Sequence, residues 1–190
     1  KINEEIDHHV CEKIKNKITG VIFTWHGGME GGNASAEILC GKENPSGKLT
    51  DTIAYSYDDY PCAKYFGNAH DEFYAEDIYV GYRYFSTFNK DKVQFPFGFG
   101  LSYTSFSLES IKYNFPDIDK GEKEFSITVK VKNTGKVPGR EIIQCYGEAP
   151  QGKLGKSKRI LLGFKKTNLI EPGKTESVNI KFDIKNFASY

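Results

Sequence analysis

The sequence has no long apolar run. Its longest uninterrupted apolar stretches, at residues 21–23 and 160–162, are short. A membrane-spanning helix needs about 20 apolar residues, so the pattern excludes a membrane span. No signal-peptide pattern opens the chain either. We therefore expect no membrane partner and a cytoplasmic location.

An excess of charge of one sign is also missing. The chain carries 26 Lys and Arg against 25 Asp and Glu, which gives a formal net charge of +1. No basic block or stripe interrupts this balance, and proteins that bind nucleic acid depend on such a stripe to neutralise phosphates. The composition therefore argues against nucleic acid as a partner.

Cysteine is sparse and widely spaced. Cys11, Cys40, Cys62 and Cys145 form no CxxC pair. A zinc site needs clustered ligands, and no two histidines have metal-ligand spacing beside a carboxylate. We predict buried, reduced thiols, with a disulfide as the alternative, and neither a metal nor a cofactor.

The chain of 190 residues is long enough for one or two domains with real cores. It opens with Lys1 rather than Met, inside an amphipathic pattern that repeats every four residues. The apolar stripe of this first helix comprises Ile2, Ile6, Val10, Ile14 and Ile18. We expect the chain to be a piece of a longer one.

A helix–strand–loop–helix order follows. Residues 21–25 are rich in β-formers and predict a buried strand, and a glycine-rich loop and a helix ending at Gly41 come next. This order is typical of an open α/β sheet. A single such unit cannot stand alone, so we expect these residues to be the end of a larger sheet or a companion to missing strands.

Residues 61–105 predict an aromatic-rich connector. Glycines punctuate dense tyrosine and phenylalanine, and neither helical nor strand periodicity persists, although residues 78–85 favour a strand. Such a dense run between domains favours packing at their interface, with sugar stacking as the alternative. The aromatic residues concerned are Tyr79, Tyr82, Tyr84, Phe85, Phe95, Phe97, Phe99 and Tyr103.

From Phe106 onward the apolar residues alternate with polar ones. Five segments with period two are separated by turn signals such as Asn133–Thr134–Gly135 and Glu171–Pro172–Gly173. This pattern predicts an antiparallel β-sandwich over residues 106–190. Sandwiches of this kind usually have about seven strands, so we expect the sandwich to be truncated.

Three blocks of sequence resemble glycoside hydrolase family 3. They are "WHGGMEGGNASAEILCGKENPSGKLTDTIA", "FYAEDIYVGYRYF" with "FPFGFGLSYTSF", and "VKVKNTGKVPGREIIQCY". In order, they are similar to the late part of the family's second domain, its connector, and the start of its fibronectin type III-like third domain. The resemblance covers about residues 17–190. It implies that residues 1–60 are the last part of an α/β sandwich domain, and that residues 106–190 form an incomplete fibronectin type III-like antiparallel β-sandwich.

The resemblance further implies a retaining β-glycosidase acting on a β-linked oligosaccharide or glycoside. A β-glucosidase is expected first, with β-xylosidase and N-acetylglucosaminidase as alternatives. Such hydrolysis needs two carboxyl groups about 5 Å apart. In the family, the nucleophile is on an (α/β)-barrel domain and the acid/base precedes the tryptophan block, so neither is in this sequence. The chain alone is predicted to be inactive and to need the barrel as its partner.

Within the chain, four residues are candidates for the edge of the sugar cleft. They are Trp25, which ends the predicted strand, His26 and Glu30, which follow it at the end where α/β sheets bind ligands, and Glu76. Glu30 could instead cap the next helix, and His26 could serve as a loop hydrogen-bonder. Glu76 is either a substrate-side carboxylate or the ion-pair partner of Arg83 or of a lysine.

Two questions of function stay open at the level of sequence. Residues 44–61 are interpreted as architectural, with a turn at Pro45 and Gly47 and a strand over residues 49–54. A non-catalytic carbohydrate-binding or scaffolding module on residues 106–190 is the alternative to the hydrolase. It would require an exposed aromatic patch on the sandwich. A homo-oligomer is possible.

Overall fold

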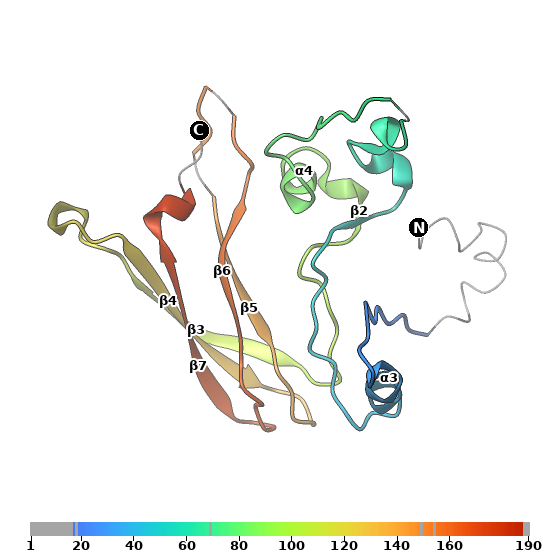
Figure 1. Cartoon of the computed structure of the whole chain (residues 1–190). Helices are drawn as coiled ribbons and strands as arrows, with labels where there is room; N and C mark the ends of the chain where they lie inside the picture. The colour runs from blue at the N-terminus through green and yellow to red at the C-terminus, as the bar shows by residue number, and fades with distance from the viewer. Residues whose placement is uncertain (1–16, 18, 69, 149, 154, 188–190) are drawn as a thin grey trace.

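The computed structural model describes residue 17 and residues 19–68, 70–148, 150–153 and 155–187. The predicted first helix falls almost entirely outside this part of the chain. No helix within the described residues is long and apolar enough to cross a membrane. Two bodies lie side by side in Figure 1: a β-sandwich, and a column of loops and short helices that runs alongside it.

The sandwich confirms the five strands expected after Phe106. One sheet has the antiparallel order β3-β4-β7, and a second sheet pairs β5 with β6. The alternation of apolar and polar side chains fits strands with one face buried and one exposed. The strands are β3 (Phe106–Asn114), β4 (Glu124–Asn133), β5 (Ile142–Gly147), β6 (Ile160–Lys166) and β7 (Thr175–Asp183).

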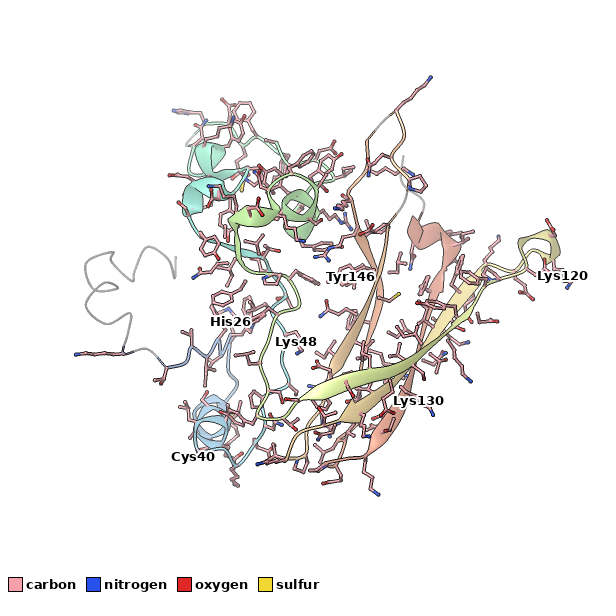
Figure 2. The ribbon with its side chains drawn as sticks, turned by 180° about the vertical axis from the view of Figure 1, so that it is seen from behind. His26, Cys40, Lys48, Lys120, Lys130 and Tyr146 are labelled. Atoms are coloured by element: carbon pink, nitrogen blue, oxygen red, sulfur yellow. The ribbon has the colours of Figure 1, made fainter. Side chains whose placement is uncertain are left out.

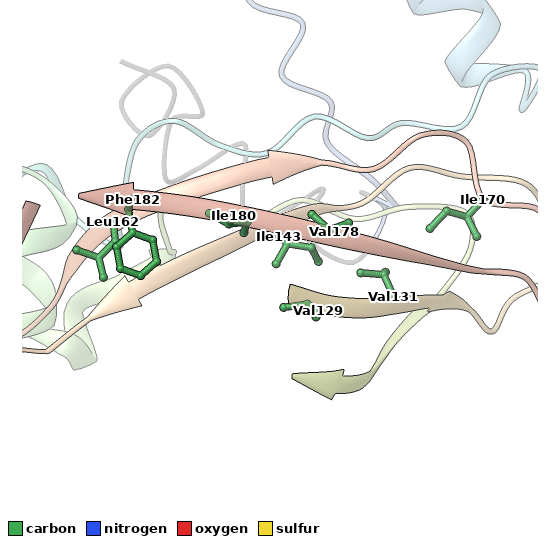
Figure 3. Close-up of a cluster of buried hydrophobic side chains, with 8 residues drawn as sticks. All are labelled: Val129, Val131, Ile143, Leu162, Ile170, Val178, Ile180 and Phe182. Atoms are coloured by element: carbon green, nitrogen blue, oxygen red, sulfur yellow. The ribbon is translucent and has the colours of Figure 1, made fainter. Parts of the chain in front are cut away.

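The core lies between these two sheets (Figure 3). Val131 is fully buried and Val178 is 1% exposed. Phe125 and Phe182 stack on neighbouring strands with ring centroids 5.6 Å apart. Each large apolar side chain removed from water contributes about 1.5–3 kcal/mol, which makes this cluster the main source of stability in the sandwich. Its buried members are Val129, Val131, Ile143, Leu162, Ile170, Val178, Ile180 and Phe182.

The predicted helix after the glycine loop is present as α3 (Gly31–Leu39). It ends as expected at Gly41, whose φ of 73° suits a residue without a side chain. The amide of Gly41 donates to the Ile38 carbonyl and that of Lys42 donates to Glu37, which is the hydrogen-bond pattern of a Schellman motif.

The strand predicted at residues 21–25 is wrong for this chain. These residues have no strand pairing, Val21 and Trp25 are 62% and 65% exposed, and Trp25 has a φ of 49°. A strand of a parallel sheet forms only against neighbouring strands, and the described part of the chain supplies none for it.

The connector holds short elements. Residues 49–54, predicted as a strand, contribute only β1 (Ile53–Ala54), which pairs with β2 (Val93–Phe95). The strand predicted at residues 78–85 is wrong, since helix α4 (Tyr82–Thr87) forms there. The 3₁₀ turns in the described part of the chain are η1 (Tyr57–Asp59), η2 (Ala63–Tyr65), η3 (Lys90–Lys92), η4 (Ile118–Lys120) and η5 (Ile184–Phe187).

Candidate functional site

The interface between the connector and the sandwich contains a nearly buried ion pair. Lys48 Nζ lies 2.8 Å from Glu141 Oε1, and their side chains are only 15% and 21% exposed. The same ammonium donates to the Gly100 carbonyl at 2.8 Å. Figure 2 places Lys48 between the two bodies. One lysine thus ties the loop after α3, the end of the connector and the start of β5 together.

Removing one member of this pair should destabilise the chain more than removing both. Lys48→Met leaves the Glu141 carboxylate largely buried without its cation, and we expect a loss of about 2–4 kcal/mol in the free energy of unfolding. The double variant Lys48→Met/Glu141→Leu should recover at least half of that loss. Denaturant unfolding of the three proteins measures both values.

The matched control is Lys181→Met. Lys181 forms an ion pair with Glu124, and the two side chains are 62% and 59% exposed. Exposed pairs of this kind contribute about 0–1 kcal/mol. If the double variant at residues 48 and 141 is less stable than Lys48→Met, the charge of Glu141 is not the cause of the loss.

Asn44 joins the same interface through both ends of its amide. Its Nδ2 donates to the Pro138 carbonyl at 2.9 Å. Its Oδ1 accepts from Ser102 Oγ and from the backbone amide of Tyr103, both at 2.9 Å. Asn44 therefore fixes the end of the connector against the turn before β5. This agrees with the architectural interpretation of residues 44–61.

Tyr82 carries the aromatic side of the interface. Its hydroxyl accepts from the Leu161 amide at 2.9 Å, and its ring lies 4.9 Å from Phe97 and 5.9 Å from Tyr146. Arg159 stacks over Tyr146 at 5.0 Å, and burial raises the pKa of the Tyr146 hydroxyl. The prediction that connector aromatics pack at the domain interface is confirmed for Tyr82, which contacts both Leu161 and Tyr146.

The glycine-rich segment before α3 forms a shallow hollow. Glu30 belongs to its lining, together with Phe23, Met29 and Ile38. Trp25 and His26 do not, and Figure 2 places His26 on the side of the connector away from the sandwich. The structure thus brings Glu30, but neither of its two predicted companions, to this surface.

The alternative role for Glu30, capping α3 with its side chain, is not observed. Glu30 stands at the N-cap position of α3, but its carboxylate makes no capping hydrogen bond to the helix backbone. It accepts instead from the Asn33 side chain amide. Glu30 is exposed, as is Met29 beside it, so the hollow presents one acidic and one apolar side chain to solvent.

Glu76 lies apart from that hollow. No ion pair of Glu76 with Arg83 or with a lysine is found among the described residues, so that prediction is wrong. The Glu76 carboxylate lies near Cys62 instead. Burial raises the pKa of the Cys62 thiol, and the neighbouring Glu76 carboxylate raises it further.

This proximity predicts a change in thiol reactivity. Glu76→Gln removes the negative charge that disfavours the Cys62 thiolate, so the pKa of the thiol falls. At pH 8, which is below the ordinary thiol pKa of 9.0, a larger share of the thiol is then ionised and alkylation becomes faster. Mass mapping after timed iodoacetamide labelling measures the rate. The exposed Cys40 is the internal control. An unchanged rate at Cys62 would show that Glu76 does not act on it.

The described cysteines are free. Cys40, Cys62 and Cys145 are free cysteines, while Cys11 lies outside the described residues. The predicted burial is wrong for Cys40, which is exposed, and Cys62 and Cys145 are only half-buried. No group of His, Cys, Asp and Glu in the described part of the chain could hold a metal ion.

Comparison with known families gives two matches in chain order. Residues 6–103 match the glycosyl hydrolase family 3 C-terminal domain. Residues 141–190 match a fibronectin type III-like domain. Neither match covers residues 104–140, which include β3 and β4.

Individual relatives agree with these matches. The chain is 48% identical to a β-glucosidase of Ruminococcus albus over 90% of its length, and 46% identical to β-glucosidase A of Butyrivibrio fibrisolvens over 94%. A β-glucosidase structure from Paenibacillus barengoltzii superposes with a TM-score of 0.85 at 45% identity over 97% of the chain. The chain spans only 17%, 23% and 20% of these three proteins.

Proposed function

The chain belongs to glycosyl hydrolase family 3, and we propose from that membership that it is the structural C-terminal part of a longer β-glucosidase. The observation that carries the proposal is that the alignments cover most of this chain but only a small part of its relatives. Nearly all of this chain aligns with β-glucosidases, yet it spans about a fifth of their length. The remaining part of such a protein has room for the catalytic barrel.

The proposed reaction is hydrolysis of a terminal β-linked glucoside with retention of configuration. It needs a nucleophilic carboxylate and a second carboxyl group, about 5–5.5 Å apart, that protonates the leaving oxygen and then activates water. We assign neither group to this chain. The described residues instead hold domains in place through Lys48, Asn44 and Tyr82 at the interface.

A contribution to the substrate cleft remains part of the proposal. Glu30 is the best placed of the predicted residues, because it lines the hollow before α3. Trp25 and His26 precede it on the same exposed segment and would join it only against a neighbouring domain. Glu76, which lies near Cys62, is a weaker candidate. The cytoplasmic location and a homo-oligomer stay predictions.

Hydrolysis of aryl β-glycosides by the longer polypeptide tests the function. We expect the β-glucoside to be cleaved faster than the β-xyloside and the N-acetyl-β-glucosaminide. Proton NMR of the first-formed sugar should show the β-anomer, as retention requires. The chain of residues 1–190 should give only the background rate. Activity in that isolated chain, or the α-anomer as first product, would contradict the proposal.

A further inference from the structure

Charge is unevenly distributed along the sequence. Residues 106–190, the part that contains the sandwich, carry 16 Lys and Arg against 10 Asp and Glu, which gives a formal charge of +6. Residues 1–105 carry 10 Lys and Arg against 15 Asp and Glu, which gives a formal charge of −5. The two parts nearly cancel in the net charge of the chain, but a basic domain still attracts polyanions to its own surface.

The outer face of the β3-β4-β7 sheet concentrates part of this positive charge. The residues of β4 that alternate with the buried Val129 and Val131 lie on the face away from the core. Residues directly opposite each other on antiparallel strands share a face, so the register of β4 with its two neighbours defines cross-strand rows on this outer face. From β3 through β4 to β7, the rows are Ser107–Lys132–Thr175, Ser110–Lys130–Ser177, Lys112–Thr128–Asn179 and Asn114–Ser126–Lys181.

Each of these rows holds one lysine and two small polar side chains. None of the side chains in the rows carries an aromatic ring or a large apolar group. Neighbouring strands lie about 4.8 Å apart, and residues on one face recur about every 7 Å along a strand, so the rows cover an area of about 10 by 20 Å. Figure 2 shows Lys130 at the side of the sandwich away from the connector. The outer face is therefore an extended, polar and basic surface.

Two lysines of the outer face have no acidic partner in the described part of the chain. Lys132 and Lys181 form ion pairs with acidic side chains, at 3.3 Å and 2.8 Å. No ion pair of Lys112 or Lys130 is found among the described residues, and both side chains are exposed. In the row of Lys112, the Asn179 side chain amide donates to Thr128 Oγ1 at 2.8 Å, which orients the amide. The face thus presents two unpaired ammonium groups among hydroxyl and amide groups.

The side chains of this face favour one class of polyanion. Single-stranded nucleic acids are held by stacking on aromatic side chains, and phosphates are bound best by the guanidinium fork of arginine; the rows contain neither. Lipid surfaces are bound by apolar side chains that enter the headgroup region, and these are missing from the rows as well. Polymers of uronic acids present carboxylates among many sugar hydroxyls, which ammonium, hydroxyl and amide groups can bind.

We propose that the outer face of the β3-β4-β7 sheet binds an acidic polysaccharide, whose uronate carboxylates pair with Lys112 and Lys130. The serine, threonine and asparagine side chains of the rows bind the hydroxyls of the same sugars. This binding role goes beyond the proposed hydrolysis and does not depend on it, because it uses only residues of the sandwich. In a β-glucosidase it would hold the enzyme on an acidic polymer while another domain cleaves neutral glucosides.

Affinity electrophoresis of the full chain tests the proposal without depending on hydrolysis. The probe in the gel is polygalacturonate, and the same polymer with its carboxylates fully methyl-esterified is the matched neutral ligand. We expect the unesterified polymer alone to retard the protein, and the retardation should decrease as salt is added because the contacts are between exposed charges.

Two double variants of equal charge locate the binding surface. Lys112→Gln/Lys130→Gln removes both unpaired charges of the outer face and should weaken binding at least about 5-fold. The matched control is Lys153→Gln/Lys166→Gln, which removes two exposed lysines of β6 and of the loop before it and should change binding by less than about 2-fold. Lys112→Arg/Lys130→Arg keeps the charge and should retain binding. Circular dichroism and melting temperatures should be the same for all of these proteins, since the substituted side chains are exposed.

Several results would overturn the proposal. Equal loss of binding in the two glutamine variants would show that only the net charge of the domain matters. Equal retardation by both polymers, or by neither, would show that uronate carboxylates are not bound. Tighter binding to a DNA duplex or to vesicles of anionic phospholipid would assign the face to another class of partner.

Discussion

Asn133→Leu should lower the free energy of unfolding by about 3–5 kcal/mol, which corresponds to a melting temperature at least about 12 °C lower. Asn133 is fully buried at the end of β4. Its Oδ1 accepts from Thr104 Oγ1 at 2.7 Å and from the Gly135 amide at 3.0 Å. Its Nδ2 donates to the carbonyls of Val137 and Ile170, both at 2.8 Å.

The physical reason is that leucine keeps the volume but none of the hydrogen bonds. The Thr104 hydroxyl, which donates to Asn133 in a buried hydrogen bond, would lose its acceptor, and a buried group left unsatisfied costs about 1–3 kcal/mol. The Gly135 amide and the Val137 carbonyl, whose bonds to Asn133 are part-buried, would also lose this partner. The Ile170 carbonyl still accepts from the Gly139 amide and adds little to the loss.

Asn168→Leu is the matched control for this prediction. Asn168 is exposed and its side chain bonds only Glu176 among the described residues, so we expect a change within about 1 kcal/mol. Calorimetric melting of both variants gives the comparison. A loss below about 1 kcal/mol for Asn133→Leu would mean that the buried amide does not organise the end of the sandwich.

Phe85→Ala should unfold the connector while the sandwich stays folded. Phe85, in α4, is 2% exposed and meets the edge of Tyr60 at a ring-centroid distance of 5.6 Å. Truncating a buried phenylalanine to alanine costs about 3–5 kcal/mol, which is large for the small aromatic contact that Phe85 makes with Tyr60. The sandwich core consists of other residues.

Hydrogen exchange resolves this selective effect. Amides of α4 should lose their protection in Phe85→Ala, and amides of β4 and β7 should keep theirs. Phe66→Ala serves as the control, because Phe66 is 82% exposed and its truncation should leave both regions unchanged. Equal loss of protection in α4 and β4 would show that the two bodies unfold as one unit.

The sandwich could be predicted strand by strand because its information is local. Alternation with period two and turn residues such as Gly173 mark each strand, and the partners of four of the five strands follow or precede at short distance. The exposure of apolar side chains on β3, such as that of Ile111, could not be predicted from the sequence. Ile111 alternates like any inward residue, and only the width of the second sheet leaves it exposed.

The two wrong strands failed for different reasons. Residues 21–25 have the composition of a buried strand, but no described residue pairs with them. Residues 78–85 are rich in aromatic and β-branched side chains, which favour strands, yet tertiary packing makes the second half helical. The rings of Tyr84 and Phe88 are in contact, and the two residues are four positions apart. This spacing is the feature of the sequence that favours a helix here.

The interface residues were harder to find than the family. Asn133 was interpreted as a turn residue, and nothing in its neighbourhood marks it as buried. Lys48 and Glu141 are far apart in the sequence and look like ordinary surface charges, so their pairing follows only from the fold. Tyr82 was predicted correctly because aromatic density between domains is a signal that composition alone carries.

The measurement that tests the central claim most directly is the intact mass, under denaturing conditions, of every polypeptide in the native preparation. The account predicts one much longer chain, or a second polypeptide, that accompanies these residues and holds both catalytic carboxyl groups. A single species near 21.5 kDa would contradict it. In that case the hydrolase assignment would apply only to relatives of this chain, and a stand-alone module would have to be considered instead.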